Sequence, residues 1–99
     1  MSLSTPSAVV TGASTGIGHA CTTLLAEKGW HVFAGVRKDA DGERLSAELG
    51  DSVTPVLIDV TKPETVESAA KQVREALAGH TLRGLVNNAG VAVAGPMLN

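Results

Sequence analysis

The sequence predicts an α/β domain whose doubly wound parallel sheet has four strands and three helices. Apolar runs of strand length alternate with segments of helical spacing, which gives four strands separated by three helices, and no internal repeat occurs. A glycine-rich turn joins the first strand to the first helix. Such alternation implies parallel strands joined by right-handed crossovers. Doubly wound folding then gives the strand order 3-2-1-4, with the first two helices on one face and the third on the other.

The first strand and the first helix are predicted within residues 7 to 28. Ser7 to Thr11 is a short apolar run of strand length, and it follows a tail of residues 1–6. The helix begins at Gly16 and stops at Gly29, since glycine commonly ends helices. Its expected core-facing residues recur at helical spacing: Ile17, Ala20, Cys21, Leu24 and Leu25.

The turn between them has the spacing G-x-x-x-G-x-G, with glycines at Gly12, Gly16 and Gly18. Glycine lets phosphate oxygens approach the backbone closely. The helix start offers unpaired N–H groups and the positive end of the helix dipole, and Ser14 and Thr15 add hydroxyl donors. An ordinary Gly/Ser turn is the alternative. The strand before the turn and the helix after it favour a pyrophosphate-binding turn.

The second and third strands and the helix between them follow. Residues 32–36 are continuously apolar, as expected of a strand buried on both faces. Residues 37–42 are predicted to form a polar loop, and a short helix is predicted over residues 43–49, ending at Gly50. The third strand is predicted over residues 53–60. Its Pro55 donates no ladder hydrogen bond, which favours an edge or strand-start position.

The last helix and strand complete the alternation. Thr61 and Glu64 have the spacing of a capping box, and Pro63 suits a first helical turn. The third helix should run to Gly79 and bury the stripe Val66, Ala69, Ala70, Val73 and Leu77. The fourth strand is predicted over residues 82–87, followed by a loop. Since strand order reverses between strands one and four, Gly12 and Asn88 should share one crevice.

Composition excludes several function classes. The net charge is −2 and no Lys/Arg block occurs, so nothing suggests nucleic acid or an anionic membrane. No apolar run approaches the ~20 residues of a membrane span, and residues 1–6 do not resemble a signal peptide. Cysteines and histidines lack metal-site spacing. The single cysteine, Cys21, excludes an internal disulfide and fits the cytoplasm.

Three segments together resemble the short-chain dehydrogenase/reductase family: residues 11–18 (TGASTGIG), Asp59-Val60 and Asn87-Asn88-Ala89-Gly90. The resemblance covers essentially the whole chain. It implies the N-terminal part of a Rossmann-type NAD(P)-binding domain, truncated before the catalytic half. A weaker resemblance, in residues 33–37 and 95–96, points to the branch that acts on retinoids, steroids or hydroxybutyrate.

The family resemblance also implies a role for each matching position. The turn would wrap the pyrophosphate and adenosine ribose, through Gly12, Ser14, Thr15, Gly16, Ile17 and Gly18. Asp59 would accept from the adenine amino group, beside the Val60 backbone. The adenosine side of the cleft would be lined by Asn88, Ala89 and Gly90. A simple helix-start acid remains the alternative for Asp59, and a turn-forming role remains the alternative for the asparagines.

The end of the second strand bears on the choice of cofactor. An acidic residue there would accept from the ribose 2′-OH of NAD and repel a 2′-phosphate. This chain instead has Val36 followed by Arg37 and Lys38, and a guanidinium suits a 2′-phosphate by charge and by its forked donors. NADP(H) is therefore favoured. NAD(H) stays open because Asp39 could reach the ribose if the strand runs long.

No catalytic residue can be assigned. The family's serine, Tyr-x-x-x-Lys pair and supporting asparagine lie beyond the Asn87–Gly90 segment, and this chain contains no tyrosine. We therefore expect the NADP(H)-binding half of an oxidoreductase that interconverts an alcohol and a ketone or aldehyde, inactive by itself. The alternatives are a non-catalytic nucleotide-binding module and an inactive truncated product that associates through its open sheet edge.

Further expectations follow from truncation. The alcohol or carbonyl substrate would bind only in a full-length protein, and homo-oligomer formation stays open. The fourth strand should have an open edge, and apolar sheet should remain uncovered beside the third helix. A domain of this size should also be of low stability in isolation.

Overall fold

A computed structural model describes residues 5–14, 16–59, 61–79 and 82–86. Its elements follow the predicted order: β1 (Ser7–Val10), α1 (Gly16–Glu27), β2 (His31–Val36), α2 (Asp39–Leu49), a 3₁₀ turn η1 (Gly50–Ser52), β3 (Val53–Leu57), α3 (Pro63–Leu77) and β4 (Gly84–Val86). All described strand pairs are parallel and the sheet order is β3-β2-β1-β4. The predicted doubly wound fold is confirmed.

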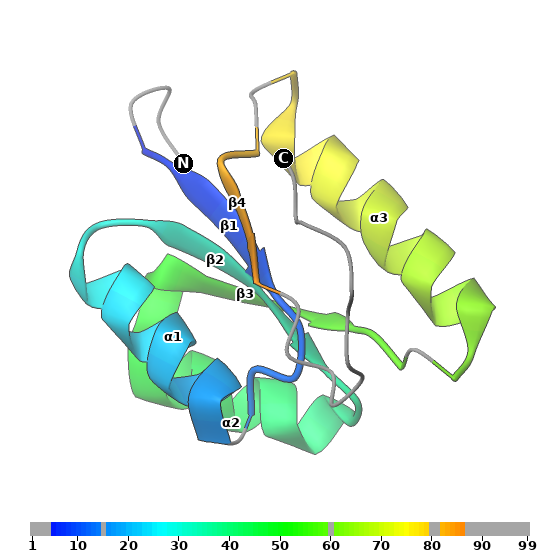
Figure 1. Ribbon diagram of the computed structural model, residues 1–99, viewed down its shortest axis with the longest axis horizontal. Coiled ribbons are helices and arrows are strands. Elements are labelled where there is room, and N and C mark those ends of the chain that lie inside the picture. Colours follow the sequence, from blue (N-terminus) through cyan, green and yellow to red (C-terminus); the bar gives the residue numbers. More distant parts are fainter. Residues whose placement is uncertain (1–4, 15, 60, 80–81, 87–99) are drawn as a thin grey trace.

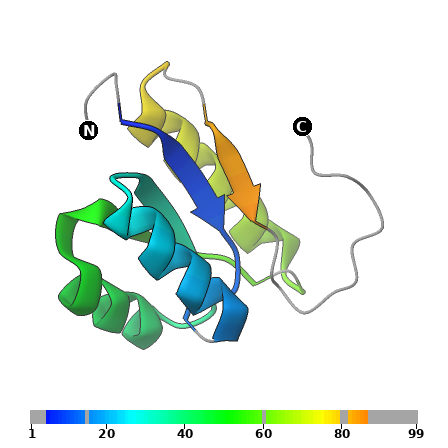
Figure 2. The same ribbon diagram turned by 60° about the vertical axis from the view of Figure 1, so that its left-hand side comes forward.

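The sheet lies between two helical layers, with α1 and α2 on one side and α3 on the other (Figures 1 and 2). Alternating strand residues supply two cores. Val10 and Ala34 belong to the core on the side of α1 and α2, whereas Val9 and Phe33 pack with Val73 of α3. β2 is almost completely buried because it is an inner strand covered on both faces. Pro55 lies in β3, at the sheet edge, as predicted.

The predicted core-facing side of α1 is partly wrong. Ile17 and Leu24 are 71% and 53% exposed, and the buried residues of the helix are Gly18 and Thr22. The Thr22 hydroxyl donates to the Gly18 carbonyl oxygen at 2.8 Å, which satisfies a polar group in the core. The hydrophobic pattern therefore predicted the wrong contact face for α1, because that face is formed by Gly18 and by Thr22, whose hydroxyl is bonded within the helix.

The second helix begins earlier than predicted, at Asp39 rather than near residue 43. Asp39 and Asp41 lie in its first turn, where carboxylates interact favourably with the helix dipole. Gly42, which suggested a loop, is buried inside the helix. A methyl group there would lie 2.8 Å from the Pro55 Cβ, so glycine allows α2 to approach β3 closely.

The predicted capping box at the start of α3 is wrong, although Pro63 is the first helical residue as expected. Lys62 occupies the N-cap position and makes no side-chain capping bond. The Thr61 hydroxyl instead donates to Asp59 Oδ1 at 2.6 Å. Thr61 therefore organises the loop after β3, which ends at Leu57 instead of continuing to residue 60.

An apolar groove of about 510 Å³ lies between α3 and the sheet. Its lining includes Val66, which is 42% exposed, and Leu85 of β4, which is 49% exposed. Within the described residues β4 pairs only with β1. Within the described residues, β4 therefore has one unpaired edge, and apolar side chains are exposed beside α3.

Gly35 should be the least replaceable glycine of the sheet. A methyl group at this position would lie 2.9 Å from Ile58 Cδ1 and 3.2 Å from the Thr11 Cα and the Val10 carbonyl oxygen. We expect Gly35→Ala to lower the free energy of unfolding by about 1–3 kcal/mol, because backbone atoms cannot move aside cheaply. Urea denaturation followed by circular dichroism measures this.

Gly84→Ala is the matched control, since its nearest contact would be an ordinary 3.4 Å to the Ala8 Cβ. Alanine in a strand is otherwise favoured over glycine, so this variant should be neutral or stabilising. In an Ile58→Val background, which removes the Cδ1 atom, Gly35→Ala should cost less. An equal loss for Gly35→Ala and Gly84→Ala would refute the steric explanation.

Candidate functional site

The glycine turn is held where the carboxyl ends of three strands meet. The Thr11 N–H donates to the Val86 carbonyl oxygen of β4 at 2.9 Å, and the Ala13 N–H donates to the Gly35 carbonyl oxygen of β2 at 2.9 Å. Ala13 is fully buried. The turn is therefore fixed to both neighbours of β1, at the point where strand order reverses.

Gly12 and Gly16 supply conformations that other residues rarely adopt. Their φ angles are 62° and 56°, in the left-handed region that favours glycine. A methyl group at Gly16 would meet nothing within 4 Å, and Ile17 beside it is largely exposed. The start of α1 thus faces open space. Its first N–H groups have no partners within the helix, so this end of α1 suits an anion.

The end of β2 presents positive charge. Arg37 follows the last strand residue, Val36, and its side chain is exposed. Asp39, the residue that kept NAD(H) open, is the first residue of α2 rather than part of a longer strand. No described carboxylate lies at ion-pair distance from Arg37. The Arg37 guanidinium is therefore exposed and forms no close ion pair with a described carboxylate, at the end of the strand next to the turn.

Asp59 is fixed by its own loop. Its Oδ1 atom accepts from the Thr61 N–H at 3.0 Å and from the Thr61 hydroxyl at 2.6 Å. These bonds lower the pKa of the Asp59 carboxyl below its usual range, and the charge of Arg37 contributes in the same direction. Both bonds go to Oδ1, so Oδ2 keeps acceptor capacity for a donor such as an amino group.

Sequence reasoning missed two residues that shape this region. The Thr65 hydroxyl accepts from the Asp59 N–H at 2.8 Å and lies 2.9 Å from the Asp59 carbonyl oxygen. The Arg44 guanidinium reaches the Ser14 carbonyl oxygen at 3.3 Å. A helix starting at residue 39 would have aligned Arg44 with Asp41, but the helix was expected to start later.

Several predicted site residues lie outside the described part of the chain, namely Thr15, Val60, Asn88, Ala89 and Gly90. Their predicted roles stay predictions. Val86, the last described residue of β4, pairs with Val10 beside the turn. The described end of β4 therefore lies beside the start of the glycine turn.

Two other kinds of site find no support in the described residues. No three histidine, cysteine, aspartate or glutamate side chains are grouped so as to hold a metal ion there. No helix in that part of the chain is long and apolar enough to cross a membrane.

Comparison with known proteins identifies the family. The short chain dehydrogenase family model matches residues 6–99. The chain belongs to this family. Its members include the uncharacterized oxidoreductase YbbO of Escherichia coli, 44% identical over 91 residues, which are 92% of this chain and 32% of YbbO. The NADPH-dependent 3-dehydrocapnine reductase of Ornithobacterium rhinotracheale is 37% identical over 90 residues, 91% of this chain and 32% of that protein.

A solved structure of the family supports the fold independently. The 3-ketoacyl-(acyl-carrier-protein) reductase from Brucella melitensis, complexed with NADH, superposes with a TM-score of 0.74 at 28% identity. The superposition covers 85% of this chain and 34% of the reductase. The chain thus spans about a third of the length of the short-chain dehydrogenases it matches.

The Asp59 loop gives a pH prediction. Because its folded-state pKa is lowered, Asp59 contributes stability that is fully present above the unfolded value near 3.8 and is lost as pH falls through the folded value. Thr61→Val removes the hydroxyl donor and should raise the Asp59 pKa toward 3.8. Titration of the Asp59 carboxyl by NMR measures this.

Arg37→Gln is the comparison variant, and it should raise the Asp59 pKa less than Thr61→Val does, since the charge acts without a direct bond. An Asp59 pKa that is unchanged by Thr61→Val would contradict the assigned cause.

Proposed function

We propose that this chain is the dinucleotide-binding part of an NADP(H)-dependent short-chain oxidoreductase that interconverts an alcohol and a ketone or aldehyde. Residues 1–99 would form the N-terminal part of its Rossmann domain, with residues 1–6 as a tail. The observation that carries the proposal is the glycine turn. Its positive-φ glycines and the exposed start of α1 stand at the reversal of strand order, where doubly wound sheets bind nucleotides.

Different residues around the turn would contact different parts of the dinucleotide. The pyrophosphate would lie against the backbone of residues 12–18, where the absence of side chains at Gly12 and Gly16 permits close approach. Asp59, ionised at neutral pH and oriented by Thr61, would accept from the adenine amino group. Outside the described residues, the segment 88–90 would line the adenosine side.

Arg37 supports the preference for NADP(H). It is exposed, no described carboxylate neutralises it at close range, and the strand before it ends without an acidic residue. A 2′-phosphate offers such a guanidinium a charge-assisted, bidentate contact. One relative is named for NADPH and a structural neighbour contains NADH, so NAD(H) remains the second candidate.

When bound, the reduced cofactor would supply the hydride that adds to the carbonyl carbon, and the oxidised cofactor would accept the hydride that is removed from the alcohol. The residues of this chain would bind and orient it. The chain contains no tyrosine to exchange the proton, so we expect it to bind without catalysing. Its free Cys21 suits a reducing compartment such as the cytoplasm.

A second candidate is an inactive product that associates through the β4 edge. The exposed Leu85 and the apolar groove beside α3 favour it. Association of this kind requires no nucleotide, so nucleotide binding separates the two candidates.

Titration with NADPH and NADH tests the proposal. We expect wild-type chain to bind NADPH more tightly, and Arg37→Gln to weaken NADPH binding about tenfold while leaving NADH unchanged, because only NADPH carries the 2′-phosphate. Calorimetry or cofactor fluorescence measures both affinities.

Arg83→Gln is the charge-matched control, since Arg83 is exposed at the amino end of β4, far from the turn in the fold. It should leave both affinities unchanged. Equal loss of NADPH and NADH binding in Arg37→Gln would overturn the assignment of the 2′-phosphate. Failure of the wild-type chain to bind either nucleotide would overturn the proposed function.

A further inference from the structure

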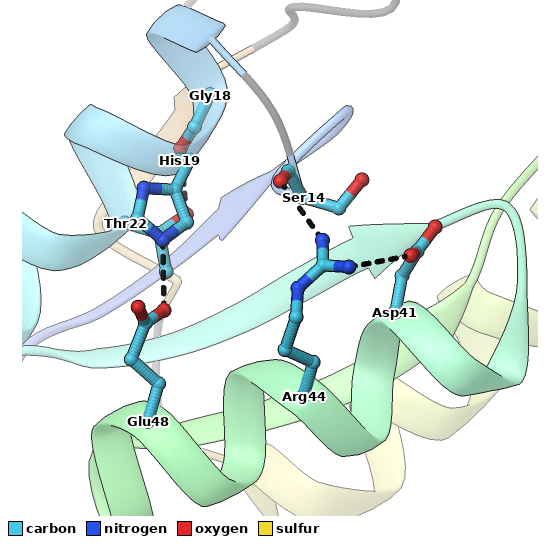
Figure 3. A network of polar contacts seen from close by, with 7 residues as sticks. All are labelled: Ser14, Gly18, His19, Thr22, Asp41, Arg44 and Glu48. Carbon is cyan, nitrogen blue, oxygen red and sulfur yellow. Dashed lines mark hydrogen bonds and ion pairs between the residues drawn. The ribbon is translucent and has the colours of Figure 1, made fainter.

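One face of α2 carries a polar stripe that faces the glycine turn. Asp41, Arg44 and Glu48 recur at intervals of three and four residues, so they share one side of the helix. Arg44 Nη2 donates to the Ser14 carbonyl oxygen at 3.3 Å, and Arg44 Nη1 lies 3.3 Å from Asp41 Oδ1. One turn further along, Glu48 Oε1 lies 2.8 Å from His19 Nε2 (Figure 3).

These contacts bracket the segment that begins α1. Ser14 lies before Gly16 and His19 lies after Gly18, so α2 contacts both sides of the helix start (Figure 3). The segment has little apolar packing of its own. Gly16 has no side chain and open space around it, and Ile17 is 71% exposed. Polar contacts from α2 therefore supply restraint that the core does not.

We propose that Arg44 is a positioning residue for the nucleotide-binding turn. Its guanidinium, oriented by Asp41, holds the Ser14 carbonyl toward α2. This bond restrains the backbone of the turn at Ser14, and backbone N–H groups at the start of a helix are what would bind an anion here. This inference rests on the proposed nucleotide binding.

The surroundings of Arg44 distinguish it from Arg37. Asp41 lies at ion-pair distance from Arg44 Nη1 and the Ser14 carbonyl oxygen accepts from Nη2, whereas no described carboxylate pairs with Arg37. A direct phosphate contact by Arg44 would have to break these bonds. Arg44 should consequently affect NADPH and NADH alike, since both carry the pyrophosphate that the turn binds.

The test compares Arg44→Gln and Arg44→Lys in the full chain, with calorimetric titration of NADPH and NADH. We expect Arg44→Gln to weaken both nucleotides by about 3–10-fold, with their affinity ratio unchanged, since the lost contact is charge-assisted but more than half exposed. Arg44→Lys keeps a cationic donor and should restore part of the loss. Arg74→Gln is the charge-matched control, since Arg74 is exposed and α3 lies on the opposite face of the sheet from α2.

A second measurement works without nucleotide. Amide hydrogen exchange at Gly12, Ala13 and Ser14 should accelerate severalfold in Arg44→Gln but not in Arg74→Gln, since loss of restraint makes local opening easier. Selective loss of NADPH binding would overturn the positioning role, and so would unchanged exchange at these amides. If wild-type chain binds neither nucleotide, the proposed function fails, and the exchange rates alone decide whether Arg44 holds the turn.

Discussion

The structure depends on how the carboxyl end of β1 is joined to its two neighbours. The Thr11 N–H bonds to the end of β4 and the Ala13 N–H bonds to Gly35 of β2. The chain therefore leaves the sheet in a fixed direction before it turns into α1. Buried N–H groups must find partners, so the reversal of strand order also determines the path of the glycine turn. The candidate site is a consequence of completing the sheet.

Close packing makes this junction possible. The β2 backbone at Gly35 lies so near Thr11 and Val10 that even a methyl group would collide with backbone atoms. On the side of the sheet that α2 covers, Gly42 allows this helix to lie directly against Pro55 of β3. Because α2 lies this close to the sheet, its polar stripe also comes within hydrogen-bond reach of Ser14 and His19. Close packing at glycine residues thus accounts both for the short distances within the sheet and for the contacts of α2 with the glycine turn.

Sequence patterns predicted the topology but not the faces and ends of the helices. Strand order follows from alternation and handedness, which depend on many residues together. The contact face of α1 depends instead on Thr22, whose hydroxyl is satisfied by Gly18 inside the helix, so hydrophobicity ranked it wrongly. The start of α2 was misplaced because Gly42 suggested a loop, and Thr61 suggested a cap while its hydroxyl bonds to Asp59. Each error involves a partner that local spacing does not reveal.

The same distinction applies to the candidate site. Glycine spacing predicted the turn because backbone conformation is a local property, and Gly12 and Gly16 have the required positive φ angles. The position of Arg37 could also be predicted from the sequence, since it follows directly from the end of β2. Arg44 was not, because its contact with Ser14 spans thirty residues of sequence and exists only once α2 has packed on β3. Both residues are arginines, so the sequence alone does not distinguish them. Arg44 has Asp41 and the Ser14 carbonyl as partners, which favours a supporting role, whereas Arg37 has no close carboxylate among the described residues, which favours a ligand-binding role.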